Sequence, residues 1–138
     1  MATHFAHAYE KGIDSQPRKT NIVASLVRDR YVADAVVILE NTPRKAARAV
    51  LKAVESANAN LLNNSGVSID PKSIRIARIF VTSGTRMRRY KPASRGRALP
   101  YEIISSNIFV EVAGEEKVKK TAEKTTKSTK AEAKKEKK

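Results

Sequence analysis

Between Pro71 and Tyr101 the sequence contains nine lysines and arginines and not one acidic residue. The densest part is residues 86–97, where six of twelve residues are basic. A surface that faces only water usually mixes charges of both signs, and a charge run is most often a solvated loop. The density of cations here argues against that alternative, because unrelieved positive charge is costly without a polyanion to neutralise it. Arginine suits such a partner, since its planar guanidinium pairs with phosphate at two points.

Alternating apolar residues on both sides of this stretch predict two strands. Ile74, Ile76 and Phe80 alternate with other residues over 74–82, and a slip near Arg78 predicts a bulge. A second alternation covers residues 98–112. If the two strands pair as a hairpin of about residues 74–112, some eight residues per strand project beyond the rest, which at ~3.3 Å per residue is roughly 25 Å. A projection of that length has no protein core of its own, so it must be disordered in isolation or be packed by a partner.

The preceding part of the chain shows helical periodicity in three segments. Residues 16–28, 33–40 and 43–63 place apolar side chains at three- and four-residue spacing. Ser15 and Thr42 are the predicted N-caps, with Pro17 and Pro43 in the first turns. Residues 1–9 alternate weakly and are a candidate third strand.

The composition changes abruptly at Gly114. Residues 114–138 contain ten lysines, five glutamates and a single large aliphatic side chain, Val118. Such a segment buries too little apolar surface to offset the entropy cost of ordering, so we expect residues 114–138 to be a disordered Lys-rich tail. Residues 1–113 form the predicted domain. They carry 18 basic and nine acidic residues, so the domain is cationic without the tail, within a chain of net charge +14.

Several classes of function are disfavoured by what the sequence lacks. It has no cysteine, no Gly-rich phosphate loop and no paired acidic motif for general acid–base work, so we expect no cofactor, no metal and no enzymatic activity. His4 and His7 would face opposite sides of a strand. No apolar run approaches the ~20 residues of a membrane span, and residues 1–9 lack the apolar block of a secretory signal. A cytoplasmic protein without a membrane partner is the simplest expectation.

A set of short segments carries a family resemblance. In chain order they are Ser15-Gln16-Pro17-Arg18-Lys19, Leu26-Val27-Arg28, Asn41-Thr42-Pro43-Arg44-Lys45-Ala46-Ala47, Glu55-Ser56-Ala57-Asn58-Ala59-Asn60, Ile79-Phe80-Val81, Met87-Arg88-Arg89 and Gly96-Arg97-Ala98. Each segment alone is unspecific, but their order and spacing together are specific. Over about residues 6–112 the chain resembles bacterial large-subunit ribosomal protein twenty-two.

The resemblance implies an α+β fold, with three helices packed on a small antiparallel sheet and one long protruding β-hairpin. It also implies a structural protein that binds large-subunit ribosomal RNA, supports subunit assembly and lies beside neighbouring ribosomal proteins. The hairpin tip, for which we expect Met87, Arg88, Arg89, Tyr90 and Lys91, would line the exit tunnel and meet the nascent polypeptide.

The expected RNA contacts combine the helix starts with the cationic hairpin. Basic side chains near helix N-termini lie beside backbone amides that can themselves bind phosphate, and Tyr90 can stack on a base. The expected residues are Arg18, Lys19, Arg44, Lys45, Arg75, Arg78, Arg86, Arg88, Arg89, Tyr90, Lys91, Arg95 and Arg97.

At four positions the chain departs from the family pattern, and no RNA contact is expected there: Ala93, Ile103, Ile104 and Asn107. Asn58 and Asn60 are open between RNA contact and a bond within the protein. Asp14 and Asp70 fit turn positions.

Two alternatives belong to other classes. A free-standing basic nucleic-acid-binding or RNA-chaperone protein would have the same net charge, although it would not need a long acid-free hairpin. A nuclease would need clustered carboxylates or a His–acid pair, and the sequence supplies neither.

Overall fold

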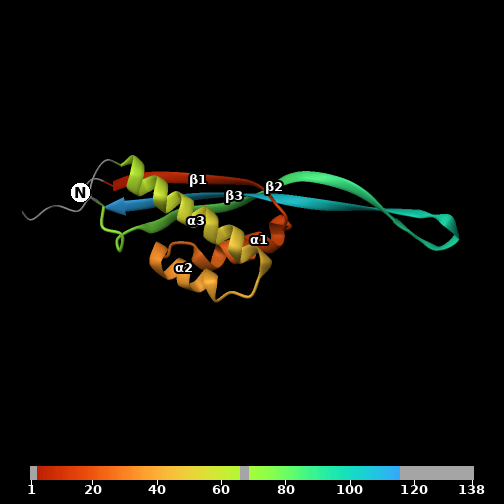
Figure 1. The fold of residues 1–138 in the computed structure, drawn as a ribbon, viewed down its shortest axis with the longest axis horizontal. Coiled ribbons are helices and arrows are strands. Elements are labelled where there is room, and N and C mark those ends of the chain that lie inside the picture. The colour runs from red at the N-terminus through yellow and green to blue at the C-terminus, as the bar shows by residue number, and fades with distance from the viewer. Residues whose placement is uncertain (1–2, 66–68, 116–138) are drawn as a thin grey trace, which may run out of the picture.

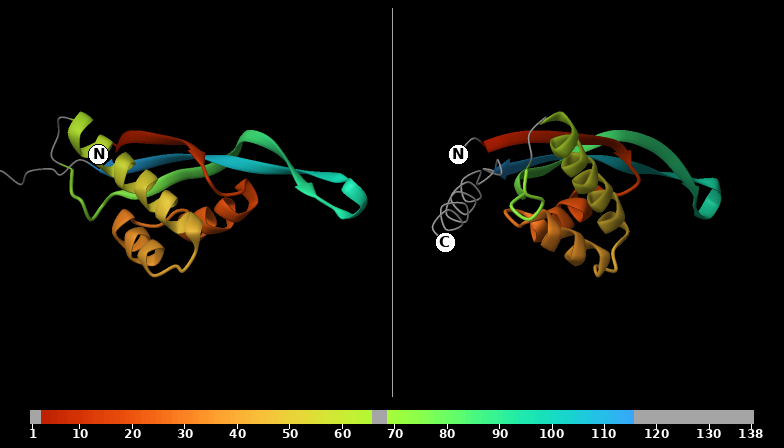
Figure 2. Two further views of the ribbon diagram at one scale, coloured as in Figure 1. Left: turned by 45° about the vertical axis from the view of Figure 1, so that its right-hand side comes forward. Right: turned by 60° about the vertical axis from the view of Figure 1, so that its left-hand side comes forward.

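The computed structural model of the protein describes residues 3–65 and 69–115. The chain forms β1 (Thr3–Ile13), α1 (Pro17–Val27), α2 (Val32–Glu40), α3 (Lys45–Asn64), β2 (Arg75–Pro92), a short 3-10 turn (Ser94–Gly96) and β3 (Ala98–Glu115). Figures 1 and 2 show the three helices on one side of the sheet. The predicted α+β fold of three helices on an antiparallel sheet is confirmed. Within the described ranges, no helix is long and apolar enough to span a membrane.

The sheet has the strand order β1-β3-β2, with β3 in the centre and antiparallel to both neighbours. One rank across the sheet consists of Ala8, Val110 and Ile79, and all three are buried beneath the helices. Because successive residues of a strand face opposite sides, the next rank points to the face without helices. The sheet therefore has one buried face and one open face.

The long helix α3 lies against β1 and β3. Its inward stripe is rich in alanine, which lets the helix approach the sheet closely. On β3, a Cβ at Gly114 would lie 2.8 Å from Ile69 and 3.0 Å from Leu61, so only glycine fits beneath this contact. The buried stripe of α3 is Ala46, Ala47, Val50, Ala53, Val54, Ala57 and Leu61.

The helices begin differently from the prediction. Pro17 does occupy the first turn of α1, but the N-cap position is Gln16 and its side chain makes no capping bond. At α3 the N-cap position is Arg44, also without a side-chain cap, and Pro43 precedes the helix. Thr42 lies two residues before that position, and its hydroxyl donates to the carbonyl of Ile38 at the end of α2. The predicted caps at Ser15 and Thr42 are therefore wrong.

The strands are longer than predicted. β1 continues to Ile13, β2 runs ten residues past Thr82, and β3 continues through Gly114 to Glu115. The predicted bulge is confirmed by a register shift between Ile76 and Arg78. The rest of the predicted tail, residues 116–138, lies outside the described residues.

Beyond the sheet, β2 and β3 continue as a two-stranded hairpin. The last pair of β1 and β3 is Ile13 with Ser106, so residues 84–105, which we call the arm, pair only with each other. The strands pair as far as Pro92 and Ala98, and Arg95 and Gly96 make the turn with φ of 58° and 70°. Figure 1 shows the arm projecting past the helices as the prediction required.

Candidate nucleic-acid interface

The expected RNA-contacting residues fall into two groups, and the first lies where α1 and α3 begin. Lys19 of α1 and Arg44 and Lys45 at the start of α3 line one shallow pocket together with Ser15, Val23 and Ala46. These basic side chains, separate in the sequence, are thus brought together by the packing of two helices. Arg18 lies in the same first turn of α1 and is exposed.

The backbone at these helix starts is suited to an anion. Neither α1 nor α3 has an acidic residue in its first turn, and neither has a side chain that caps the free amides. Pro17 has no amide proton, and the Lys19 and Ala47 amides bond to the carbonyls of Gln16 and Arg44. The amides that remain in these first turns, together with the helix dipole, favour negative charge at this position. The nearby acids are exposed: Asp14 forms an ion pair with Lys45, and Glu40 lines the hollow between α2 and α3.

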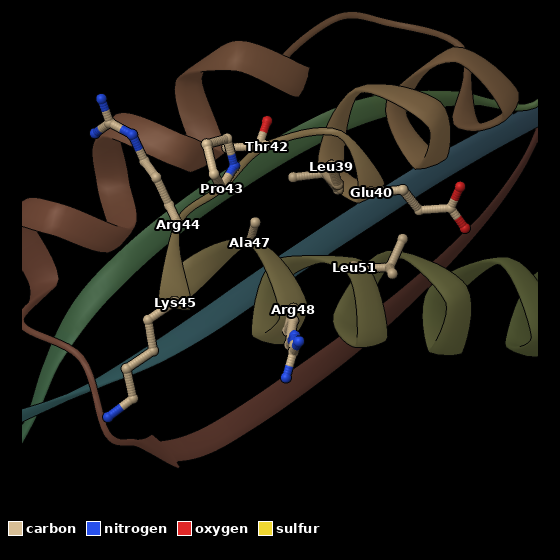
Figure 3. A pocket seen from close by; sticks show the side chains of 9 residues that line it. All are labelled: Leu39, Glu40, Thr42, Pro43, Arg44, Lys45, Ala47, Arg48 and Leu51. Atoms are coloured by element: carbon tan, nitrogen blue, oxygen red, sulfur yellow. The ribbon is translucent and has the colours of Figure 1, made fainter.

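One cation of this group was missed by the sequence prediction. Arg48 follows Arg44 by one helical turn and lines the hollow between α2 and α3 with Arg44 and Lys45. In Figure 3 Arg44 projects to one side of the helix, whereas Lys45 and Arg48 project to the other. Lys52 continues the row one turn later. The spacing of Lys45, Arg48 and Lys52 by three and four residues was the signal that could have identified Arg48 and Lys52.

The second group lies along β2 and the turn of the arm. Arg75 and Arg78 belong to the sheet, and the remaining residues belong to the arm, where all are exposed: Arg86, Arg88, Arg89, Tyr90, Lys91, Arg95 and Arg97. Tyr90 keeps 69% of its surface exposed, so one ring of the arm is open to a partner. The arm and the helix starts form two separate cationic surfaces.

A single acidic residue, Glu102, faces these cations within the arm. It pairs with Arg88 in the register, and its carboxylate lies 3.8 Å from Arg88 Nε and 3.9 Å from Arg86 Nη1. Exposed pairs of this kind contribute little to stability. Glu102 follows directly after the acid-free stretch in the sequence, so its position opposite Arg88 emerges only from the strand register.

The end of the hairpin lies six residues further along the chain than predicted. Met87 pairs with Ile103 and Lys91 with Leu99, so residues 87–91 lie on the shaft of the arm, not at its tip. The strands keep their pairing until the left-handed residues Arg95 and Gly96 reverse the chain. The tip is therefore Ala93–Arg97. The contact of residues 87–91 with a tunnel stays a prediction.

Among residues 3–65 and 69–115, no group of three or more His, Cys, Asp or Glu side chains could hold an ion. The chemistry available at both surfaces is charge neutralisation, hydrogen bonding and ring stacking.

Comparison with known proteins agrees with the fold. The family model of ribosomal protein L22p/L17e matches residues 8–113. The chain belongs to this family. Among its relatives, the large ribosomal subunit protein uL22 of Metamycoplasma arthritidis (strain 158L3-1) is 39% identical over 97 residues, which cover 70% of this chain and 45% of that protein. The matched region thus spans less than half the length of that relative.

Three of the four residues at which no RNA contact was expected have partners within the protein. The side-chain carbonyl of Asn107 accepts a hydrogen bond of 3.0 Å from the Gly12 amide, which joins β1 to β3 beside the arm. Ile103 and Ile104 are half-buried and pair with Met87 and Arg86.

Of the two asparagines left open by the sequence, Asn60 has a partner within the protein. The Asn60 amide donates to the carbonyl of His7, so it fastens α3 to β1. Asp70 accepts a bond from the Lys72 amide, as expected at a turn, whereas Asp14 pairs with Lys45.

Proposed function

We propose that the protein is a structural constituent of the large ribosomal subunit in the cytoplasm that binds ribosomal RNA, supports subunit assembly and has no catalytic role. The observation that supports this most directly is the cationic arm on a domain of the L22p/L17e family. The arm holds six basic side chains and one acid, and its residues from Thr85 to Glu102 are exposed apart from half-buried Ala93.

The physical argument begins with the missing core of the arm. A two-stranded ribbon is marginally stable in water when nothing packs against it. Phosphates placed around the ribbon would neutralise its arginines and supply the packing that the protein lacks. Ribosomal RNA is a partner dense enough in phosphate to surround the ribbon on all sides.

The helix starts supply a second attachment point. Lys19, Arg44, Lys45 and Arg48 gather around two uncapped helix N-termini, which suits RNA backbone phosphates. We infer that this surface docks the domain on the subunit, beside neighbouring ribosomal proteins. The arm then reaches inward, and its tip at Ala93–Arg97 would line the exit tunnel and meet the nascent polypeptide.

Sedimentation of large subunits tests the proposal. We expect the protein to remain on the large subunit through a moderate salt wash, and to bind ribosomal RNA with a slope of log affinity against log salt on the order of −4 to −8, as six to nine phosphate contacts require. A free-standing nucleic-acid-binding or RNA-chaperone protein would instead leave the subunit in the wash. A slope near −1 would contradict a phosphate-dominated contact altogether.

A further inference from the structure

The open face of the sheet carries an unusual concentration of aromatic side chains. All three phenylalanines of the chain lie there, together with Tyr9 and His7. Phe5, Tyr9 and Phe80 keep 61%, 47% and 41% of their surface exposed. These rings lie on the side of the sheet opposite the helices, and neither the core nor the two cationic surfaces described above use them.

Three of the rings form a row across all three strands. The ring of Phe109 on the central strand stacks on Phe80 of β2, with centroids 4.7 Å apart and planes 21° apart. On its other side it stacks on His7 of β1, at 5.9 Å and 16°. The row is therefore close to parallel, and it ends on the two edge strands. In the part of the chain that the structure describes, no further strand continues the sheet on either side.

Positive charge borders this row at both edges. Arg75 and Arg78 of β2 face the same side, and on β1 the ammonium of Lys11 lies 5.3 Å from the centre of the Tyr9 ring. The one acid in this rank, Glu111, lies 3.6 Å from Arg78 Nε. The face thus combines flat rings in its centre with cations at its borders.

We propose that the open face of the sheet binds unpaired nucleotides of RNA. Bases would stack on the row of rings, and the phosphates between them would be neutralised by Lys11, Arg75 and Arg78. This inference rests on the proposed function and adds to it a third contact surface, on the other side of the sheet from α1 and α3.

The chemistry of the face favours an RNA strand over other partners. Aromatic rings on a sheet stack with any base, whereas paired bases within a duplex have no free face to offer. An apolar protein partner would leave Lys11 and Arg75 without a counter-charge, whereas the RNA backbone supplies one at each nucleotide. We therefore expect a preference for single strands with little dependence on base sequence.

Binding of a defined probe to the full chain tests the proposal. The probe is a single-stranded 12-nucleotide RNA that contains 2-aminopurine, compared with the same RNA closed into a duplex. Stacking on the rings quenches 2-aminopurine fluorescence, and we expect quenching with the single strand only. Because the chain has no tryptophan, Phe80→Trp places a single reporter at the end of the row, and its emission should also change when RNA binds.

Matched variants separate stacking from general charge. Phe80→Leu and Tyr9→Leu remove a ring but keep apolar bulk, and each should weaken single-strand binding roughly 5- to 100-fold, the range of a lost base–aromatic stack. Phe80→Tyr keeps the ring and should bind like the parent, which also controls for folding. Leu62→Ala, an exposed apolar change on α3, should have no effect.

Binding of the parent protein to large-subunit RNA in the same titration separates this inference from the proposed function. If the parent binds that RNA with steep salt dependence but the ring variants bind equally well and 2-aminopurine stays bright, the open face is not an RNA site and only this inference fails. If the ring variants keep full RNA affinity but release a neighbouring ribosomal protein, the face is a protein contact and the inference is overturned. If the parent binds no RNA, the proposed function fails first and the inference fails with it.

Discussion

The hydroxyl oxygens of Thr20 and Ser106 lie 3.2 Å apart, and both side chains are fully buried. The contact joins α1 to β3 at the residue where the arm leaves the sheet. The Thr20 hydroxyl also donates to the carbonyl of Gln16. The Ser106 hydroxyl bonds to α1 through Thr20. The two residues therefore depend on this bond to different degrees.

Substitution of these two residues should give unequal costs. Thr20→Val leaves a buried Ser106 hydroxyl without its partner and should lower the free energy of unfolding by about 1–3 kcal/mol. Ser106→Ala should cost less, because the Thr20 hydroxyl keeps its bond to Gln16. In the double variant Thr20→Val/Ser106→Ala, no hydroxyl is left without a partner. Its loss of unfolding free energy should therefore be smaller than the sum of the losses of the two single variants. Urea unfolding of all four proteins measures this, and strictly additive costs would show that the bond does not matter.

The glycine beside this contact gives a second prediction. A Cβ at Gly84 would lie 2.6 Å from Ser105 Oγ, and that hydroxyl donates a 2.9 Å bond to the carbonyl of Thr85. Gly84→Ala should therefore destabilise the domain by about 1–3 kcal/mol, the usual cost of overpacking. Adding Ser105→Ala removes the nearest atom and should recover part of the loss. Thermal melting compares the variants, and an unchanged melting temperature for Gly84→Ala would contradict the close approach.

Shortening the arm should separate stability from assembly. Residues 87–91 pair with residues 99–103, so removing both segments shortens the ribbon without shifting the register of the remainder. Because the removed side chains lie outside the core, the free energy of unfolding should stay within about 1 kcal/mol of the parent. The shortened protein should still join the large subunit, and chemical mapping should change within the tunnel only. Failure to enter the subunit would make the arm an assembly anchor, and an unchanged tunnel would place its tip elsewhere.

Substitution of Asp14 tests the helix-start surface, because it should strengthen RNA binding where the loss of a cation should weaken it. The Asp14 carboxylate forms an exposed ion pair with Lys45. Asp14→Asn should therefore free that lysine and strengthen binding to ribosomal RNA. Each of Lys19→Gln, Arg44→Gln and Arg48→Gln should weaken binding and reduce the salt slope by about 0.7–0.9. None should change stability by more than about 0.5 kcal/mol, the scale of surface substitutions. Filter binding at several salt concentrations gives both quantities, and weaker binding of Asp14→Asn would argue against a phosphate contact here.

The sequence predicts those parts of the fold that bury a regular pattern of apolar residues. Helix α3 and the strand from Ile108 to Val112 were found because one side of each is packed. The extension of β1 to Ile13 was missed, since Lys11 and Gly12 interrupt the alternation just where the strand leaves the core. The tip of the arm was misplaced for a related reason: a ribbon that is exposed on both faces has no buried side to set a period. Glu102 shows the same limit, because only the strand register places it opposite Arg88.

The central position of β3 also determines when the sheet can form during synthesis of the chain. Each edge strand forms its ladder with β3, and the outermost pair joins Thr3 to Glu115. Contacts between such distant parts of a chain close late and slow folding. During synthesis, β1, the helices and the cationic β2 all appear before the strand that joins them. The sheet can therefore form only when residues up to Glu115 have left the ribosome that makes the chain. Until then the basic side chains of β2 are accessible to other polyanions.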